Sequence, residues 1–463
     1  MGPLCAYSEV HNVRRLRAML ALALVLVLAV CAWGQDEAEP PADDWTGTPE
    51  QKVMGLATIW AEAKYAFPSF EQLPGLDWDQ SFQEFIPRVI AAEDRDEYYW
   101  TLMEFAGLLE DGHTIVLPPW EYFRPDYDNP PLEVQVVDGS FVVARLADTP
   151  EIATAGLAVG DEILAIDGVD TRTYFEDSVN RYYPRGSAHA NDAVNTVYAL
   201  RGPAGSSVDL RILDASGEER DATLTRDWMV PGAGPFFPRI LLALMADPAM
   251  EITALDGGAV LIRINHFEDP AMGDQFLEFI DGLDESEVAG LIFDLRFCMG
   301  GRGDIAEKMI GALIDEPVSS PLWRYPRYVA AEASWGRPPE PGEASNTIHP
   351  RDGRRYLGPV VALTSGVTSS TAKDLPISLR AAGRAVLVGE NTAGSAGNAL
   401  ERALPGGGTF QMATFRAYLP DGGEYVGIGA APDIAVAPTR EDIRNGVDPA
   451  LAAALDVLAG WEE

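Results

Sequence analysis

The chain has 463 residues, of which 47% are hydrophobic and 9% aromatic, values typical of a folded protein with room for two or three domains. Its formal net charge of −37 argues against binding to nucleic acid or to anionic membranes, because both bind clusters of Lys and Arg. A solvated acidic surface that keeps the protein soluble is the simpler interpretation of this charge.

The N-terminus has the features of a secretory signal peptide. Arginines between residues 14 and 17 precede the apolar run "AMLALALVLVLAVCA", and small residues follow up to Gly34. The run is shorter than the ~20 residues of a transmembrane helix. We therefore predict a signal peptide over residues 1–34 and a secreted or periplasmic protein. A lipoprotein modified at Cys31 and an uncleaved signal anchor, the one route to membrane attachment, are alternatives.

Cysteine and histidine give little reason to expect a metal or another cofactor. Of the 3 cysteines only Cys298 lies outside the predicted signal peptide, so the mature chain makes no intrachain disulfide. The 5 histidines are scattered and show no ligand spacing such as His-x-x-x-His. We expect no cofactor and no metal.

Four segments follow the signal peptide. Residues 35–48 are acidic and contain proline, which indicates a flexible leader. Residues 49–125 have apolar residues at helical intervals and predict a helical module. Residues 126–228 predict a β-rich domain, which begins with two strands around a turn at Asp138-Gly139. Residues 229–463 alternate strands with helices, interrupted by a long Pro- and Gly-rich loop over 316–358. The fold class is therefore α/β and multi-domain.

The stretch "TSGVTSSTAKD" (364–374) holds six hydroxyl side chains and directly follows an apolar strand. A strand, a Ser-rich turn and a helix bring backbone N–H groups and the positive end of the helix dipole next to a hydroxyl, a favourable setting for an anionic intermediate. Taken alone, the stretch is more often a helix cap than a nucleophile site.

Two further stretches add to this pattern. "FDLRFCMGG" (293–301) is a buried strand that ends in two glycines, where a backbone N–H can approach a ligand closely. "LLEDGHT" (108–114) contains His113, and His is the usual base for a serine nucleophile. Each stretch alone is more often structural, as a turn or as a core histidine.

Together the three stretches resemble peptidase family S41, the C-terminal-processing or tail-specific proteases. "GLIFDLRFCMGG" resembles that family's "DLRxNxGG", "LTSGVTSSTAKDL…RAVLVGENTAG" its "SASAAE…RAxxxGExTxG", and "DGGEYVGIGAAPDI" its final "GxGxxPD" segment. The resemblance covers nearly the whole mature chain in the family's order. It implies a catalytic domain of the ClpP/crotonase-like type over 229–463.

The resemblance also implies roles for individual residues. The middle serine of the family's "SAS" falls on Ser370, the expected nucleophile. The lysine of the family's Ser-Lys subgroup is absent, because Ser395 follows Gly394, and Lys373 does not replace it. The chain therefore resembles the His-type, tricorn-like subgroup, in which His113 is the general base.

Further parts of the site are expected by the same comparison. The N–H groups of Thr371 and of Gly300 or Gly301 would form the oxyanion hole. The glutamate that supports the site in the His-type subgroup falls on Val426, and Glu424, two residues earlier along the strand, is the candidate replacement.

The segment over residues 126–228 resembles a PDZ domain, with "AGLAVGDEILAIDG" as its best-matching run. Such domains add a peptide as a β-strand, which places the candidate peptide-binding residues at Leu132, Glu133 and Val134. Pro130 and Pro131 remove two N–H donors from the loop that would hold a C-terminal carboxylate, which weakens carboxylate binding.

The sequence thus predicts a serine endopeptidase that cleaves peptides or protein tails outside the cytoplasm, with no nucleic-acid partner. Two alternatives remain at this point. One is a catalytically impaired relative that binds peptides or other ligands, and the other is an envelope scaffold that acts through the PDZ-like domain.

Overall fold

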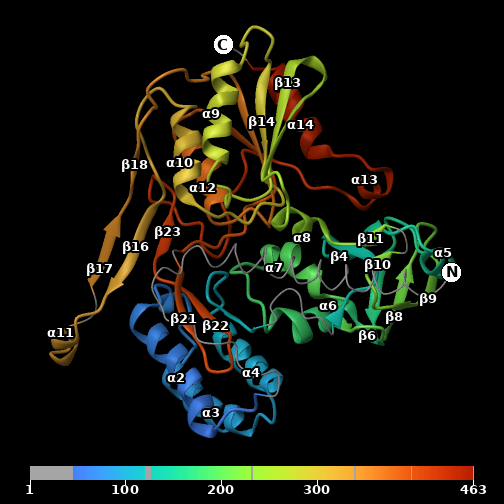
Figure 1. Ribbon diagram of the computed structural model, residues 1–463, viewed down its shortest axis with the longest axis vertical. Coiled ribbons are helices and arrows are strands. Elements are labelled where there is room, and N and C mark those ends of the chain that lie inside the picture. Colours follow the sequence, from blue (N-terminus) through green and yellow to red (C-terminus); the bar gives the residue numbers. More distant parts are fainter. Residues whose placement is uncertain (1–44, 120–126, 231–232, 338–339, 398, 462–463) are drawn as a thin grey trace, which may run out of the picture.

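The computed structural model describes residues 45–119, 127–230, 233–337, 340–397 and 399–461. The predicted signal peptide and most of the acidic leader lie outside the described residues. None of the described helices is both long and apolar enough to cross a bilayer. The chain forms a helical N-terminal region, a β-rich region and a larger α/β region, which confirms the predicted fold class (Figure 1).

Three helices form the N-terminal region, as predicted. They begin after Thr48, Asp77 and Asp94, whose side chains each accept a hydrogen bond from the backbone N–H three residues later. The helices and the short 3-10 helix between them are α2 (Pro49–Ala66), η1 (Phe70–Gln72), α3 (Trp78–Ala91) and α4 (Arg95–Gly107). Their apolar faces meet in one core, in which the Trp78 and Phe105 rings stack at 4.3 Å.

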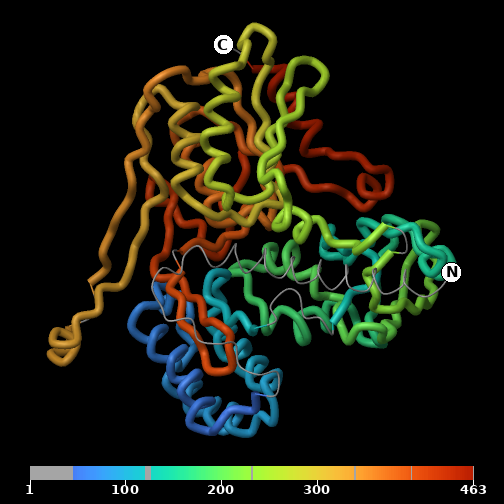
Figure 2. The backbone as a smooth tube through the Cα atoms, in the orientation of Figure 1, coloured from blue at the N-terminus to red at the C-terminus, as the bar shows by residue number. Residues whose placement is uncertain are grey.

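A hairpin from the C-terminal half of the chain completes this helical region. Strands β21 (Ala399–Ala403) and β22 (Thr409–Ala413) pair with each other, and β22 pairs with β1 (Ile115–Leu117). The Tyr99 hydroxyl donates to the Pro405 carbonyl at 3.0 Å, across 306 residues of sequence. In Figure 2 this red-orange hairpin lies against the blue helices. The pairing ties the loop that carries His113 to the α/β region.

The β-rich region contains a sheet of order β3-β4-β5-β8-β9, with β6 paired to β5. Asp138 and Gly139 have positive φ angles of 50° and 82°, the conformation of a tight two-residue hairpin turn, as predicted. The region has strands β2 (Tyr127–Asp128), β3 (Leu132–Val137), β4 (Ser140–Leu146), β5 (Glu162–Ile166), β6 (Val169–Asp170), β7 (Gly202–Pro203), β8 (Ser207–Leu213) and β9 (Glu219–Thr225).

Helical segments between β6 and β7 pack on this sheet, a feature that the sequence analysis did not predict. They are α6 (Thr171–Phe175), the π-helical turn η2 (Glu176–Asn180), α7 (Ala188–Val194) and the 3-10 helix η3 (Asn195–Tyr198). A further helix, α5 (Pro150–Ala155), lies between β4 and β5. Strands β10 (Met229–Val230) and β11 (Gly234–Pro235) and helix α8 (Arg239–Leu244) then lead into the α/β region.

The α/β region is built on a six-stranded sheet of order β12-β13-β14-β19-β20-β24. Strand β12 is antiparallel to β13, and the other neighbours are parallel. The strands are β12 (Met250–Ala254), β13 (Ala259–Ile264), β14 (Gly290–Asp294), β19 (Val360–Thr364), β20 (Val386–Gly389) and β24 (Ile434–Ala435). Every residue of β14 and β19 is buried, as expected for parallel strands covered on both faces.

Helices cover both faces of this sheet (Figure 1). Helices α9 (Met272–Gly282), α10 (Gly303–Gly311) and α12 (Thr371–Ala381) share one core, and α14 (Pro449–Ala459) packs into a second core on the opposite face. Helix α13 (Arg440–Asn445) precedes α14. The carboxyl ends of the parallel strands lie at one edge, where ligands of such sheets usually bind.

The prediction of a loop over 316–358 was wrong, because this segment contains paired strands. They are β15 (Val318–Ser319), β16 (Leu322–Arg327), β17 (Glu340–Ala344) and β18 (Thr347–Ile348), with α11 (Ala330–Ser334) between β16 and β17. Strand β16 also pairs with β23 (Arg416–Tyr418). Pro326 and Pro341 face each other across the β16–β17 pair. Prolines and glycines usually interrupt central strands, which hid this projecting hairpin from a local analysis of the sequence.

Candidate active site

The stretch 364–374 lies at the carboxyl end of the sheet, between β19 and α12. Ser370 directly precedes α12 and has φ 49° and ψ −134°, a backbone conformation that residues with a side chain rarely adopt. Holding a non-glycine residue there costs on the order of 1–3 kcal/mol, and such strain collects at functional sites. A strained serine on a strand-to-helix turn is also the geometry that exposes a nucleophilic hydroxyl in other hydrolases.

The hydroxyl groups of this stretch are not equivalent. Five of the six hydroxyls each donate a hydrogen bond to a backbone carbonyl at 3.0 Å or less. They belong to Thr364, Ser365, Thr368, Ser369 and Thr371. Ser370 is the exception, since its hydroxyl has no hydrogen-bond partner within the described residues. The other hydroxyls fix the turn, and Ser370 stays available for chemistry.

The two glycines predicted for the oxyanion hole lie directly against Ser370. A Cβ atom on Gly300 would lie 2.7 Å from the Ser370 Cβ and 3.0 Å from the Thr371 nitrogen, so only glycine fits. The φ angles of Gly300 and Gly301 are 110° and 135°, which other residues avoid. Among the described residues, the N–H groups of Gly301 and Thr371 donate no hydrogen bond, which leaves both open to an oxyanion.

Cys298 lies beneath the same turn and is completely buried. Burial raises the pKa of its thiol to about 12, although the N–H of Gly300, directed at the sulfur, acts in the opposite direction. The thiol is therefore protonated and unreactive near neutral pH. Because the Gly300 N–H faces this sulfur, Gly301 is the better placed oxyanion donor of the two.

His113 is held by the short loop between α4 and β1. The Asp111 carboxylate accepts hydrogen bonds from the His113 backbone N–H at 2.9 Å and from the Thr114 hydroxyl at 2.8 Å. Gly112 packs so closely against Arg185 that a Cβ would lie 2.5 Å from the Arg185 carbonyl oxygen. The "DGHT" sequence thus fixes the backbone of the histidine through both of its neighbours.

The His113 ring has an unusual electrostatic environment. Its Nδ1 atom is buried and has no hydrogen-bond partner. Burial, together with the positive charges of Lys373 and Arg185, lowers the pKa of His113 to about 4. The ring is therefore neutral at pH 7 and able to accept a proton. No hydrogen bond joins His113 to Ser370 in the described part of the chain.

The structure brings Lys373 into the site, a residue that the sequence analysis had set aside. Its side chain is only 2% exposed, and its ammonium lies 2.5 Å from the Asp374 carboxylate and 5.1 Å from the centre of the Tyr425 ring. Burial opposes its charge, but Asp374 and Tyr425 raise the pKa of Lys373 above the usual value. A cation in the first turn of a helix is unfavourable, because the helix dipole is positive at that end. A lysine at this position of the sequence is therefore unusual, and such exceptions are expected at functional sites.

Glu424 does not contact the His113 ring. Its side chain is 58% exposed and its carboxylate lies 3.5 Å from Arg416. Arg416 is buried, donates to the Val426 carbonyl at 3.1 Å, and acts electrostatically on Asp111. The predicted supporting role of Glu424 stays a prediction, and in this geometry it can reach His113 only indirectly, through Arg416 and Asp111.

A groove of about 990 Å³ runs between the β-rich region and the carboxyl end of the α/β sheet. The predicted peptide-binding residues Leu132, Glu133 and Val134 line it together with the turn residues Ser365 to Val367. The Leu132 and Val134 side chains are buried in the core, and Glu133 pairs with Arg145 at 2.8 Å. Within the described sheet β3 is an edge strand, so its backbone rather than these side chains is what a peptide could meet.

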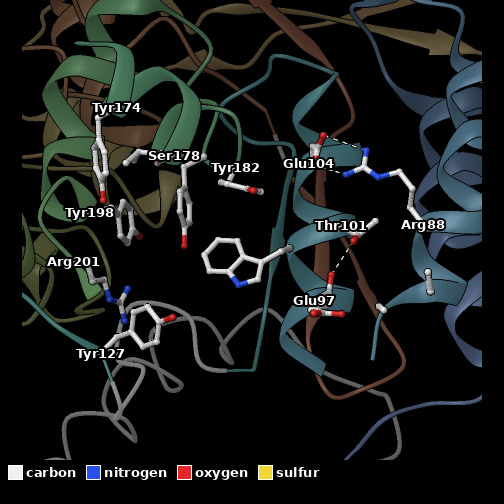
Figure 3. Close-up of a pocket in the computed structure, with 15 residues that line it drawn as sticks. Arg88, Glu97, Thr101, Glu104, Tyr127, Tyr174, Ser178, Tyr182, Tyr198 and Arg201 are labelled. Carbon is white, nitrogen blue, oxygen red and sulfur yellow. Dashed lines mark hydrogen bonds and ion pairs between the residues drawn. The ribbon is translucent and has the colours of Figure 1, made fainter. Parts of the chain in front are cut away.

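A second cavity of about 550 Å³ lies between the helical region and the β-rich region. Figure 3 shows tyrosines and charged side chains that face it, with Arg88 paired to Glu104. The Tyr183 and Tyr198 rings stack at 4.2 Å, and Trp100 meets Tyr182 edge-on at 4.9 Å. None of the residues predicted for catalysis lines this cavity, so we assign it no part in the reaction.

Comparisons with known proteins relate this chain to peptidases. The model of peptidase family S41 matches residues 259–436, which span the strands, the glycine turn and Ser370. The carboxyl-terminal-processing protease of Synechocystis sp. is 25% identical over 431 residues, covering 89% of this chain and 88% of the relative. That of Picosynechococcus sp. is 25% identical over 391 residues, covering 82% of this chain and 80% of the relative.

A likeness in fold extends over most of the molecule. The crystal structure of mature CPAF superimposes with a TM-score of 0.68 at 17% identity, covering 89% of this chain and 96% of that chain. The family model, the relatives in sequence and the arrangement of strand, glycine turn and serine all lead to one assignment. The chain is a serine-type peptidase whose residues 259–436 match the model of peptidase family S41.

Proposed function

We propose that this peptidase is a serine endopeptidase that acts outside the cytoplasm, with Ser370 as the nucleophile and His113 as the general base. The observation that carries the proposal is the conformation of Ser370, a strained residue at the start of α12 whose hydroxyl has no partner among the described residues. A fold maintains such strain where the exposed group has a use.

The reaction follows from the groups around Ser370. His113 takes the proton of the Ser370 hydroxyl as the oxygen bonds to the carbonyl carbon of a peptide. The N–H groups of Gly301 and Thr371, at the positive end of the α12 dipole, stabilise the resulting oxyanion. When the peptide C–N bond breaks, His113 returns the proton to the leaving amine. Water then cleaves the acyl-enzyme by the same two steps.

The groove beside β3 supports a role of the β-rich region as a PDZ-like peptide-binding domain. An extended segment can add to the open edge of β3 through backbone hydrogen bonds, which select for an extended conformation rather than for a sequence. Because Pro130 and Pro131 lack N–H groups, a free C-terminus would contribute little. A peptide and its C-terminally amidated form should therefore bind with similar affinity, as measured by titration calorimetry with the inactive Ser370→Ala variant.

An activity-based probe tests the chemistry. A fluorophosphonate should label the wild type at Ser370, found by mass spectrometry of the tryptic digest, and should not label Ser370→Ala. Labelling of His113→Ala should slow by a factor of roughly 10²–10⁴, the typical contribution of a general base. Labelling that survives in Ser370→Ala would disprove the assignment of the nucleophile.

A second function has one observation in its favour. In the part of the chain that the structure describes, the His113 ring has no carboxylate partner, and the positive charges of Lys373 and Arg185 disfavour the protonated ring that forms during the reaction. A catalytically impaired protein that binds peptides in the groove fits this environment. Peptide binding without labelling or cleavage between pH 4 and pH 9 would support this second function over the first.

The proposed location rests on the predicted signal peptide over residues 1–34. Expression of the full chain in a bacterial host, fractionation and N-terminal sequencing test it. Recovery outside the cytoplasm with Gln35 at the N-terminus is the expected result, and an intact Met1 in the cytoplasm would contradict it.

A further inference from the structure

Glu268 follows β13 at the carboxyl edge of the sheet and is fixed to the glycine turn. The Phe267 N–H donates to the Gly300 carbonyl at 2.8 Å, and the Phe267 carbonyl accepts from the Arg302 N–H at 2.8 Å. Two hydrogen bonds therefore hold the backbone next to Glu268 in register with the turn that lies against Ser370. The position of the carboxylate is set by this framework and not by a free loop.

The carboxylate itself is close to the proposed reaction centre. The Glu268 Oε1 atom lies 2.7 Å from where a Cβ on Gly301 would be, and a Cβ on Gly300 would lie 2.7 Å from the Ser370 Cβ. Since consecutive Cα atoms are ~3.8 Å apart, Oε1 and the Ser370 Cβ are separated by at most about 12 Å. An extended peptide advances roughly 3.3–3.6 Å per residue, so the side chains nearest the scissile bond come within reach of Glu268.

The Glu268 carboxylate has no hydrogen bond or ion pair within the described residues. The charge of Arg302 acts on this carboxylate, and the Arg302 guanidinium pairs with Asp304 at 2.8 Å. Burial raises the pKa of the half-buried Glu268 to about 7, and the charge of Arg302 only partly offsets this. An anion in this position is poorly compensated, and a cation supplied by a ligand would stabilise it.

We propose that Glu268 is a specificity-determining residue, which binds a basic side chain, Lys or Arg, of the peptide substrate beside the scissile bond. The inference rests on the proposed function of Ser370 as nucleophile. The net charge of −37 favours the same substrates, since an acidic protein attracts basic peptides over a distance. Glu268 would convert this general attraction into a preference at one position of the peptide.

The preference should depend on pH, because only the ionised carboxylate attracts a cation. Arg302 and the Cys298 thiol on the glycine turn interact electrostatically with Glu268, and the Nδ1 of His266 accepts from the Glu268 N–H at 3.3 Å. Asp304 at the start of α10 pairs with Arg302. The preference for a basic side chain should be largest near pH 8 and should disappear below about pH 6.

A ratio of rates tests the proposal. Two internally quenched peptides, identical except for Lys or Gln beside the scissile bond, are compared in kcat/KM, with the variable residue placed in turn at each of the two positions on either side. The wild type should prefer the Lys peptide by roughly tenfold at one of these positions at pH 8, and Glu268→Gln should lower this ratio to about one. Because each ratio is measured within a single variant, a loss of folded enzyme cancels.

A matched control separates the local effect from net charge. Glu278→Gln removes one negative charge from the exposed face of α9, the helix that follows Glu268 in the chain, and should retain the wild-type ratio. Retention of the Lys preference in Glu268→Gln, or its equal loss in Glu278→Gln, would overturn the proposal. If the wild type is labelled at Ser370 but shows no preference for the Lys peptide, the role of Glu268 is disproved and the proposed function stands. A wild type that is not labelled would remove the proposed function and this inference with it.

Discussion

Replacement of Lys373 by Met tests whether the buried charge controls the protonation of His113. A positive charge near the ring makes it harder to add a second one, so its removal should raise the pKa of His113. In the wild type this pKa lies at about 4, below the ordinary value near 6.5. Burial is the largest cause of the lowering, and Lys373 is the largest of the two charge contributions.

The size of the effect follows from the environment of the lysine. The ammonium is 2% exposed, so water screens it weakly, but Asp374 at 2.5 Å cancels part of its field. An interaction on the order of 1 kcal/mol remains at an effective dielectric constant near 20–40, which corresponds to somewhat less than one pKa unit. The pKa of His113 is therefore expected to rise by up to about one unit in Lys373→Met and to stay below its ordinary value, because burial and Arg185 still act.

The assay is the pH dependence of kcat/KM for an uncharged peptide between pH 3.5 and pH 8. Its acid limb reports the pKa of the base in the free enzyme. The limb should move up by about one unit in Lys373→Met and return toward the wild-type position in Lys373→Arg. Lys52→Met is the matched control, since Lys52 is a buried lysine that donates to the Ala92 carbonyl in the helical region, away from the site.

Three results would refute this reasoning. A wild-type acid limb near pH 6.5 would mean that neither burial nor the lysine lowers the pKa of the base. An acid limb that moves equally in Lys373→Met and Lys52→Met would mean that the shift comes from a general loss of stability. A limb that moves toward lower pH in Lys373→Met would contradict the sign of the interaction.

Three other substitutions have defined outcomes. Gly300→Ala should lower kcat by ~10²-fold or more while circular dichroism stays native, because its Cβ would lie 2.7 Å from the Ser370 Cβ and displace the oxyanion turn. Arg296→Met should lower the free energy of unfolding by up to about 3–5 kcal/mol in urea titrations, since buried Asp294 then keeps only the longer ion pair with the half-exposed Arg263 at 3.7 Å, whereas Asp448→Asn at the more exposed partner should cost less. Ser370→Gly should unfold at higher temperature than Ser370→Ala, by an amount equivalent to about 1 kcal/mol, because glycine adopts φ 49° without strain; equal stability would argue against the strain.

The α/β region was predictable because its signals are local. The buried strands β14 and β19 are short apolar runs between amphipathic helices, and their ends carry the glycine turn and the hydroxyl stretch. Parallel strands bring their carboxyl ends to one edge, so the proximity of Gly300 to Ser370 follows from the order of strands and helices alone. The close contact between Gly300 and Ser370 agrees with that expectation.

Features that depend on distant pairing were not predictable. The β21–β22 hairpin completes the core of a helical region some 300 residues earlier, and nothing within its own sequence points to that partner. The projecting β16–β17 hairpin is rich in proline, and local preferences therefore indicate a loop. Lys373, Tyr425 and His113 likewise come from three separate segments of the chain. The effect of the Lys373 charge on the His113 ring depends on their proximity and burial, which the sequence does not give.

The site residues share a property that no single sequence motif displays. Ser370 has a strained backbone, and among the described residues the buried Nδ1 of His113 has no hydrogen bond and the half-buried Glu268 carboxylate has no hydrogen-bond donor. Each arrangement costs free energy, whereas the nearby buried Asp294 carboxylate accepts two hydrogen bonds from the Arg296 guanidinium. The carboxyl edge of the sheet can therefore pair a buried charge, as it does for Asp294, but polar groups close to Ser370 are left without partners among the described residues. This concentration of uncompensated groups is what a binding and reaction site for a polar substrate requires, because the substrate supplies the missing partners.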